Sequence, residues 1–429
     1  MTQSRHTYAM YSKIKNLSAL AVLTLAASSA AAPVQISYWA GHGSGALHKA
    51  VLAEVALFNR THPAIHVTFR AIGASKRGLA AFEAGQAPNL AMVSSYVVPQ
   101  LAQAGAILNL RPFVHGADGL TPAQIAQRYY PAVWRDMHTS SGQLYQMPLE
   151  KKALMVVYYN ASLFKRAGIH HLPASWSQVS ADLAKISALG HQIHGAAWTP
   201  ALRQFFDIVR ADGGRVFAPG HPRRRFDLVN AGARQALTML RGWVKSGEVI
   251  LTSGYQYQLD FGTGNVGMLF DASAGYTYDK GSVGGKFYMG GLPDPVGSSG
   301  FSSQEINGAS LVLFGTGSLA QKQAAWTFMK WLSSPKVNAY WNAHTNYLPL
   351  GPAVYQLMRP FYRAHPAWAA SFSDPAQWWY KPRTANYVAA RNALQAILLE
   401  ALRGQIGVGA ALRQMNQTGN AYLSGKLRG

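Results

Sequence analysis

Hydrophobic and polar positions follow two different periods along the first hundred residues. The segment 34–40, "VQISYWA", alternates between apolar and polar residues, which is typical of a β-strand. The next segment, 45–63, carries apolar residues at helical spacing, at Leu47, Val51, Val55 and Phe58. The same alternation predicts a strand over 65–72, a helix over 75–85, a strand that ends at Ser94 and Ser95, and a helix over 96–105.

A second region with the same alternation begins near residue 143. The pattern predicts two strands around a polar break within 143–160, further strands over 194–198, 266–271 and 308–314, and helices over 161–168, 175–190 and 231–245. The last hundred residues are mainly helical in pattern. Alternating strands and helices indicate an α/β fold with sheets flanked by helices on both faces.

In such sheets, ligands bind beyond the carboxyl ends of the strands. The first strand ends at Trp39, with His42 following in a glycine-rich loop, and the third ends at Ser94 and Ser95. Trp198 ends a later strand, and an aromatic face is suited to bind the C–H groups of a polyol. We therefore expect these residues at a ligand site, with packing in the core as the alternative for each aromatic residue.

The N-terminus has the pattern of a secretory signal peptide. Basic residues at Lys13 and Lys15 precede an apolar stretch from Leu17 to Ala27, and small residues follow. We expect residues 1–31 to be removed on export to the periplasm; an N-terminal membrane anchor is the alternative. The chain contains no cysteine, which excludes disulfides, cysteine-based metal sites and attachment as a lipoprotein.

The chain is strongly basic, with 39 Lys and Arg against 17 Asp and Glu and a net charge of +22. Nucleic-acid binding is one explanation. The basic residues are scattered, however, so an exported protein that binds no nucleic acid is favoured. A basic surface-interaction protein remains an alternative.

Motifs for catalysis are weak. The segment "GTGNVG" at 262–267 has dinucleotide-binding spacing, but it follows a helical pattern and precedes a strand, so a turn is predicted. The 14 histidines show no metal-binding spacing, and we expect no metal and no cofactor. A secreted carbohydrate hydrolase, which needs two placed carboxylates, remains an alternative that no pattern supports.

Several segments resemble, in order, the periplasmic solute-binding proteins of ABC importers, of the maltose-binding type. The segments are "GLAAFEAGQAPNLAMVSSYVVPQLAQAGAILNL", "VVYYNASLFKRAGI", "FGTGNVGMLFDASAG", "INGASLVLF", "AAWTFMKWLSSP" and "TNYLPLGPAVY". Within this family the chain is most similar to the sn-glycerol-3-phosphate-binding proteins. The resemblance implies a type II periplasmic binding protein fold, in which two lobes, each a mixed sheet flanked by helices, close on a ligand in the cleft between them.

The resemblance also implies that each lobe is discontinuous. We expect residues 32–142 to form the first lobe, with 272–318 returning to it. Residues 143–271 are expected to form the second lobe, with 319–429 as its mainly helical completion.

Motif matches imply ligand contacts at Ser273, Gly308, Tyr347 and Arg391, with Arg391 reaching a phosphate. Two departures from the family pattern make the cleft more favourable for an anion. Ser95 stands where the family often has an acidic residue, and Lys151 or Lys152 stands near the family's serines.

The sequence thus predicts a periplasmic, monomeric substrate-binding component of an ABC importer, which catalyses no reaction. It would deliver a small polyhydroxylated solute, such as sn-glycerol 3-phosphate, a glycerophosphodiester or a sugar, to a permease in the inner membrane. A neutral oligosaccharide is the alternative ligand.

Overall fold

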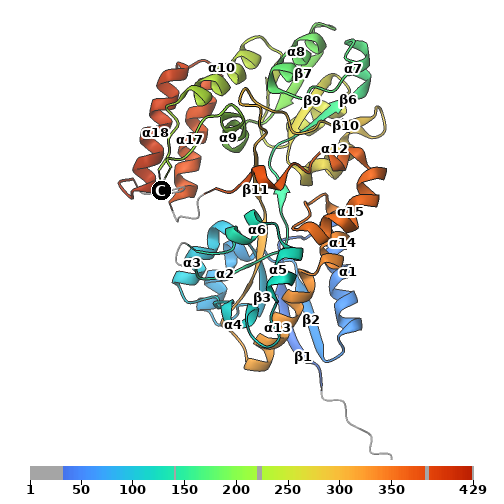
Figure 1. The fold of residues 1–429 in the computed structure, drawn as a ribbon, viewed down its shortest axis with the longest axis vertical. Helices are drawn as coiled ribbons and strands as arrows, with labels where there is room; N and C mark the ends of the chain where they lie inside the picture. Colours follow the sequence, from blue (N-terminus) through green and yellow to red (C-terminus); the bar gives the residue numbers. More distant parts are fainter. Residues whose placement is uncertain (1–31, 140–141, 220–224, 382–385, 428–429) are drawn as a thin grey trace, which may run out of the picture.

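The computed structural model describes residues 32–139, 142–219, 225–381 and 386–427. The predicted signal peptide, 1–31, lies outside the described residues. The molecule is elongated and has two lobes, one above the other in Figure 1, joined by a narrow central region. Within the described ranges, no helix is long and apolar enough to cross a membrane.

The first lobe, the lower one in Figure 1, is built on a five-stranded mixed sheet in the order β2-β1-β3-β12-β4. Strands β1 (Val34–Trp39), β2 (Ile65–Arg70) and β3 (Leu90–Ser94) run parallel, and β12 (Ala309–Leu313) is antiparallel to both β3 and β4 (Met147–Pro148). The helices of this lobe that precede the second lobe in sequence are α1 (Gly45–Thr61), α2 (Ala74–Glu83), α3 (Val98–Gln103), α4 (Arg111–Val114), α5 (Pro122–Arg128) and α6 (Pro131–Asp136). A 3₁₀ turn, η1 (Ser95–Val97), connects β3 directly to α3.

The second lobe has a five-stranded mixed sheet in the order β10-β6-β9-β7-β8. Its strands are β6 (Val156–Asn160), β7 (His194–Trp198), β8 (Val249–Leu251), β9 (Val266–Asp271) and β10 (Met289–Gly291), of which β7, β8 and β9 run parallel. Its helices are α7 (Ala161–Arg166), α8 (Trp176–Ser187), α9 (Leu202–Ala211), α10 (Ala231–Lys245), α11 (Gln256–Gly262), α12 (Tyr276–Val283), α17 (Tyr387–Leu402) and α18 (Val408–Leu423), with a 3₁₀ turn η2 (Ser273–Gly275).

Polar side chains begin several of these helices. The Asn160 side chain accepts hydrogen bonds from the backbone N–H groups of Ser162 and Leu163 at the start of α7. Ser175 and Asn230 cap α8 and α10 in the same way. Each cap satisfies N–H groups that have no partner inside the helix, which explains why the helices begin where the sequence pattern predicts.

A third, small sheet joins the lobes. Its strand order is β13-β11-β5, with β13 (Trp378–Trp379), β11 (Gln304–Asn307) and β5 (Lys152–Ala153). Each strand comes from a different passage of the chain between the lobes, and Figure 1 shows β11 at the junction. The remaining connection there contains α15 (Pro352–Ala364), α16 (Pro366–Ala369) and η3 (Pro375–Gln377). The lobes are therefore connected by three crossing segments, here called the hinge because crossing strands between two lobes are a common site of closure.

The expected division of the chain differs from the structure in three places. Helices α13 (Leu319–Leu332) and α14 (Pro335–Thr345) pack on β1 and α1 of the first lobe, whereas the sequence placed them with the second. Helix α12 and strand β10 belong to the second lobe, although the sequence placed them with the first. Strand β4, expected in the second lobe, pairs with β12 of the first. These assignments depend on pairing between distant segments, which local hydrophobic patterns do not encode.

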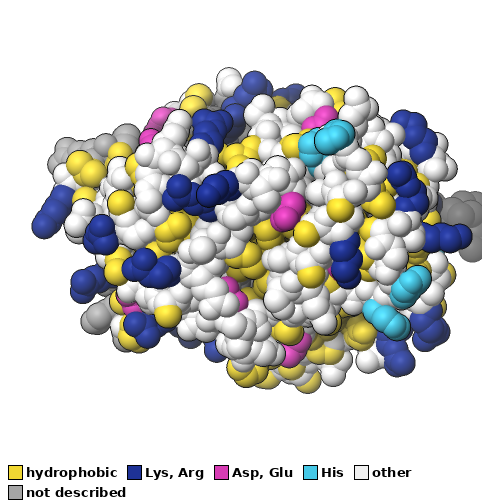
Figure 2. Space-filling view, turned by 90° about the horizontal axis from the view of Figure 1, so that it is seen from above, with side chains coloured by type: hydrophobic (Ala, Val, Ile, Leu, Met, Phe, Trp, Pro, Cys, Tyr) yellow, Lys and Arg dark blue, Asp and Glu magenta, His cyan; other side chains and the backbone are white. Residues whose placement is uncertain are grey.

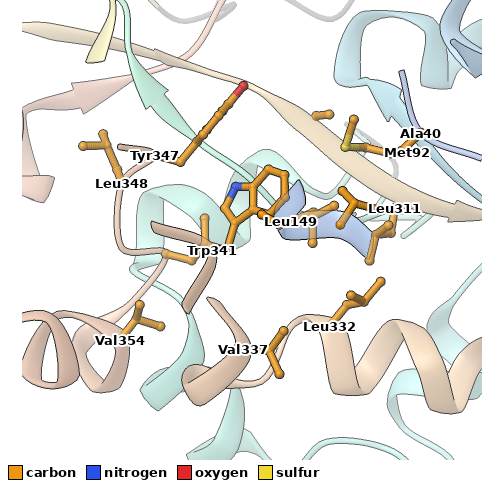
Figure 3. Close-up of a cluster of buried hydrophobic side chains, with 14 of the residues drawn as sticks. Ala40, Met92, Leu149, Leu311, Leu332, Val337, Trp341, Tyr347, Leu348 and Val354 are labelled. Atoms are coloured by element: carbon orange, nitrogen blue, oxygen red, sulfur yellow. The ribbon is translucent and has the colours of Figure 1, made fainter. Parts of the chain in front are cut away.

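The core of the first lobe continues up to the hinge. Figure 3 shows Trp341 of α14 between Tyr347 and Leu149, in a cluster that also contains Leu311 and Val337. The ring of Trp341 lies 5.9 Å from that of Tyr347, measured between centroids. Close packing of aromatic rings of this kind keeps the core rigid next to the hinge.

Candidate functional site

Both lobes direct the carboxyl ends of their parallel strands toward the space between them. Residues at or just after the ends of β1 and β3 of the first lobe, including His42 and Ser94, line a recess of about 250 Å³, here called the first-lobe chamber. Residues at or just after the ends of β7, β8 and β9 of the second lobe, including Thr199, Tyr255 and Asp271, line a larger recess of about 590 Å³, here called the main recess. Lys152 and Asn307 of the hinge line both, so the two spaces meet.

Four basic side chains line the main recess: Lys152, Arg203, Lys381 and Arg391. Two acidic side chains, Asp271 and Glu305, line it as well. The Nζ atom of Lys381 lies 3.6 Å from Oε1 of Glu305, and the Nε–H of Arg203 donates to the backbone oxygen of Leu154 at 3.5 Å. Positive charge is therefore in excess along the recess.

Two of these cations lie near the amino ends of helices. Arg203 is the second residue of α9, and Arg391 lies just after the first turn of α17. The amino end of a helix carries partial positive charge, so it repels cations and attracts anions. These positions therefore add to the positive potential of the recess instead of neutralising it.

The pKa values of Lys152 and Lys381 are shifted by burial and by nearby charged side chains. Burial lowers the pKa of Lys152, and Arg203 lowers it further, while Glu150 and Asp271 oppose the change. Burial also lowers the pKa of Lys381, with Arg391 and Arg203 acting in the same direction and Glu305 opposing them. An anion bound among these side chains would relieve their mutual repulsion.

Glu150 lines the first-lobe chamber and is 4% exposed. Its Oε2 atom lies 3.2 Å from Nε2 of His42. Burial alone would raise the pKa of Glu150, but His42, Lys152 and the hydroxyl of Tyr347 together hold that pKa below its usual value. The chamber therefore contains an ionised carboxylate at neutral pH.

Asp271 ends β9 at the main recess, with the buried Asp279 of α12 beside it. Oδ2 of Asp271 accepts a hydrogen bond from Nε2 of Gln258 at 3.2 Å. Burial raises the pKa of Asp271, and burial together with Asp271 raises the pKa of Asp279 to about 9. Asp279 is therefore protonated at neutral pH, because two adjacent buried carboxylates resist carrying two negative charges.

Among the residues that the structure describes, no group of three or more His, Asp or Glu side chains is placed to hold a metal ion. The "GTGNVG" segment forms a turn between α11 and β9, in which Gly264 has φ of 93°. This conformation agrees with the predicted turn, since a positive φ is readily adopted by glycine.

Comparison with known proteins identifies the class. Residues 40–339 match the family described as bacterial extracellular solute-binding protein. The chain belongs to this family. The family resemblance predicted from the sequence motifs is thereby confirmed.

The solute-binding protein is similar along most of its length to several known proteins. It is 23% identical to the sn-glycerol-3-phosphate-binding periplasmic protein UgpB of Pectobacterium atrosepticum over 367 residues, 82% of each chain. The structure of the sugar-binding protein MalE from Xanthomonas citri matches with a TM-score of 0.75 and 22% identity, covering 92% of this chain and 98% of that one. The structure of UgpB from Mycobacterium tuberculosis in complex with glycerophosphocholine matches with a TM-score of 0.76 and 17% identity, covering 92% and 99%. These likenesses confirm the predicted two-lobe fold.

Six of the residues predicted for the site line the spaces between the lobes: His42, Ser94, Ser95, Lys152, Gly308 and Arg391. Ser95 is 8% exposed and lines only a very small space; its hydroxyl lies 3.2 Å from that of Ser310. Of the two adjacent lysines, Lys152 lines the main recess, whereas Lys151 is 1% exposed and points into the first lobe. Successive side chains in extended backbone point to opposite faces, which explains the difference.

Four other predicted residues do not line these recesses: Trp39, Trp198, Ser273 and Tyr347. Trp39 and Trp198 end their strands inside the core, and Trp198 donates its Nε1–H to Oε1 of Gln204. Ser273 is fully buried. Tyr347 is buried next to the chamber, with Lys152 Nζ 5.8 Å from its ring centroid. These two tryptophans therefore adopt the alternative stated for each aromatic residue, which is packing in the core.

Sequence reasoning missed several lining residues. Asp271 was detectable, because it ends a predicted strand whose carboxyl end must reach the cleft. Arg203 carried a weaker signal, since it follows the strand end at Trp198. Glu305 and Lys381 carried none, because only the hinge sheet brings β11 next to β13.

Proposed function

We propose that this solute-binding protein is the substrate-binding component of an ABC importer. It captures a small polyhydroxylated solute that carries a phosphate, sn-glycerol 3-phosphate or a glycerophosphodiester, and delivers it to a membrane permease. The protein binds and releases its solute by hinge motion and catalyses no reaction.

The observation that carries this proposal is the excess of basic side chains in the main recess. The four basic residues face two acidic ones, and α9 and α17 add the positive ends of their dipoles. Arginine pairs bidentately with phosphate, and such charge-assisted bonds are about twice as strong as neutral ones. The volume of about 590 Å³ falls within the range of small-molecule sites. The glycerophosphocholine complex of the Mycobacterium tuberculosis protein supports the same ligand class.

A neutral oligosaccharide is the second candidate, and aromatic side chains favour it. Tyr255, Tyr257 and Tyr387 line the main recess, and Tyr255 is 75% exposed. Exposed aromatic faces suit the apolar faces of sugar rings. The similar Xanthomonas citri structure is described as a sugar-binding protein, which supports this alternative.

Two proposals of other classes have less support. Asp271 and Glu305 both line the main recess, as a carbohydrate hydrolase would require. Each is already engaged, however, Glu305 by Lys381 and Asp271 by Gln258. A basic interaction surface would need a continuous face of lysine and arginine. Figure 2 shows these side chains spread in separate groups over the end of the molecule at the top of Figure 1.

Titration calorimetry with sn-glycerol 3-phosphate, glycerophosphocholine and maltose tests the proposal. We expect the phosphate ligands to bind and maltose to bind far more weakly. Arg391→Ala should weaken phosphate-ligand binding about 10- to 100-fold, since a hydrogen bond to a charged group contributes roughly 1.5–3 kcal/mol.

The matched control is Arg403→Ala, which removes an exposed arginine from the other end of α17. It should leave the affinity unchanged. Tight binding of maltose with no binding of either phosphate ligand would replace the proposal by the oligosaccharide alternative. Release of monosaccharide from maltose during the titration would instead indicate a hydrolase.

A further inference from the structure

The first-lobe chamber differs chemically from the main recess, although the two spaces meet. Its lining contains the ionised carboxylate of Glu150 and the hydroxyls of Ser75 and Ser94. Of the four basic residues it contains only Lys152, which stands at the boundary with the main recess. A single ligand can therefore extend from one space into the other and meet different chemistry in each.

Backbone forms part of the chamber wall, which allows a ligand to approach closely. Gly41, Gly73 and Gly308 all line it. A Cβ atom at Gly308 would lie 2.0 Å from the backbone oxygen of Glu150, so no side chain fits at that position. Backbone therefore packs directly against backbone in this part of the chamber wall, which requires glycine at position 308.

The Glu150 carboxylate has capacity for more hydrogen bonds than the protein supplies. An ionised carboxylate only accepts, and it offers about four lone-pair positions. His42 lies 3.2 Å from Oε2, and the Tyr347 hydroxyl donates to the same group. The remaining positions can accept from hydroxyls of a solute, whereas a phosphate oxygen, which carries negative charge and no proton to donate, would be repelled.

The two serines complement this acceptor. The Ser75 hydroxyl oxygen accepts from the backbone N–H of Ser94 at 2.8 Å, which leaves its own hydrogen to donate. A donor and an acceptor that line the same space suit a hydroxyl group, which can do both. These observations point to recognition of hydroxyls next to Glu150.

We infer that the first-lobe chamber is a subsite for the hydroxyl-bearing end of the solute, and that Glu150 sets ligand orientation by accepting from its hydroxyls. The anionic end then lies in the main recess, near Arg203, Lys381 and Arg391. This inference rests on the proposed function, since it assumes a solute with one anionic and one hydroxylated end.

The test compares sn-glycerol 3-phosphate with propyl phosphate, which keeps the phosphate and lacks both hydroxyls. Wild type should bind sn-glycerol 3-phosphate about 10- to 100-fold more tightly, because hydroxyls bonded to a charged acceptor are lost in propyl phosphate. Glu150→Gln should reduce the ratio of the two affinities to within about threefold. Binding of sn-glycerol 3-phosphate should weaken, while binding of propyl phosphate stays equal or improves.

Two further variants separate recognition from folding. Ser94→Ala removes one of the two serine hydroxyls of the chamber, and it should also lower the affinity ratio. Arg391→Ala should weaken both ligands alike and leave the ratio unchanged. Equal losses for both ligands in Glu150→Gln, or an unchanged ratio in both chamber variants, would overturn the inference alone. Failure of wild type to bind either phosphate would overturn the proposed function and the inference with it.

Discussion

Lys151 offers a quantitative test of how the hinge is attached to the first lobe. Its side chain is 1% exposed, and Nζ lies 3.9 Å from Oδ2 of Asp136, whose side chain is 3% exposed. Nζ also lies 3.5 Å from the hydroxyl of Ser95 and 3.4 Å from that of Ser310. The lysine immediately precedes β5, so it connects a hinge strand to the core of the lobe.

Lys151→Met keeps most of the side-chain volume but removes the ammonium group that faces the buried carboxylate of Asp136. Removal of one partner from a buried ion pair lowers the free energy of unfolding by about 3–5 kcal/mol. Addition of Asp136→Asn should recover part of that loss, because both charges of the buried pair are then removed. Urea denaturation followed by tryptophan fluorescence measures both changes.

A surface pair is the matched control. Nζ of Lys185 lies 3.0 Å from Oδ1 of Asp182, a shorter distance than in the buried pair, but the Lys185 side chain is 54% exposed. Lys185→Met should therefore lower the free energy of unfolding by only about 0.2–1 kcal/mol. The reasoning fails if Lys151→Met is no more destabilising than Lys185→Met, or if the double variant loses as much as the sum of its single changes.

Three further predictions concern stability and pH. Gly308→Ala should lower the melting temperature strongly, because its Cβ would lie 2.0 Å from a backbone oxygen. Gly242→Ala on α10, where nothing lies within 4 Å of the added Cβ, should instead stabilise the protein by about 0.5–1 kcal/mol. Equal melting temperatures for the two variants would contradict this reasoning. Burial raises the pKa of Asp279 to about 9, so the native state keeps a proton that the unfolded chain loses near pH 4. The free energy of unfolding therefore falls as the pH rises from about 4 to about 9. Asp279→Asn should thus be more stable than wild type at about pH 8, with a smaller difference at about pH 5, and a difference independent of pH would refute the cause. Trp198→Phe should lower the free energy of unfolding by about 1–3 kcal/mol without changing ligand affinity, and a tenfold loss of affinity would return Trp198 to the ligand site.

Local pattern predicted the position of most elements near the cleft. The strand that ends at Ser94 does so as predicted, and the alternation of strand and helix placed His42 beyond the first strand end. Periods of two and of about 3.6 residues are properties of short segments, so a sequence displays them directly. The same periods could not show which strands pair, and helices α13 and α14 were therefore assigned to the other lobe.

The sequence by itself determined the fold class, the family and the strand ends that line the recesses, because these depend on local patterns and on motifs in order. It left open the choice between Lys151 and Lys152, and for Trp39 and Trp198 the choice between a ligand site and the core. Only the tertiary structure decided these points, since side-chain direction and burial depend on the surrounding packing. The hinge sheet brings Lys152, Glu305 and Lys381 together from three distant passages of the chain. Contacts of such long sequence separation arise from strand pairing across the fold, and this is why the charge of the recess became visible only in three dimensions.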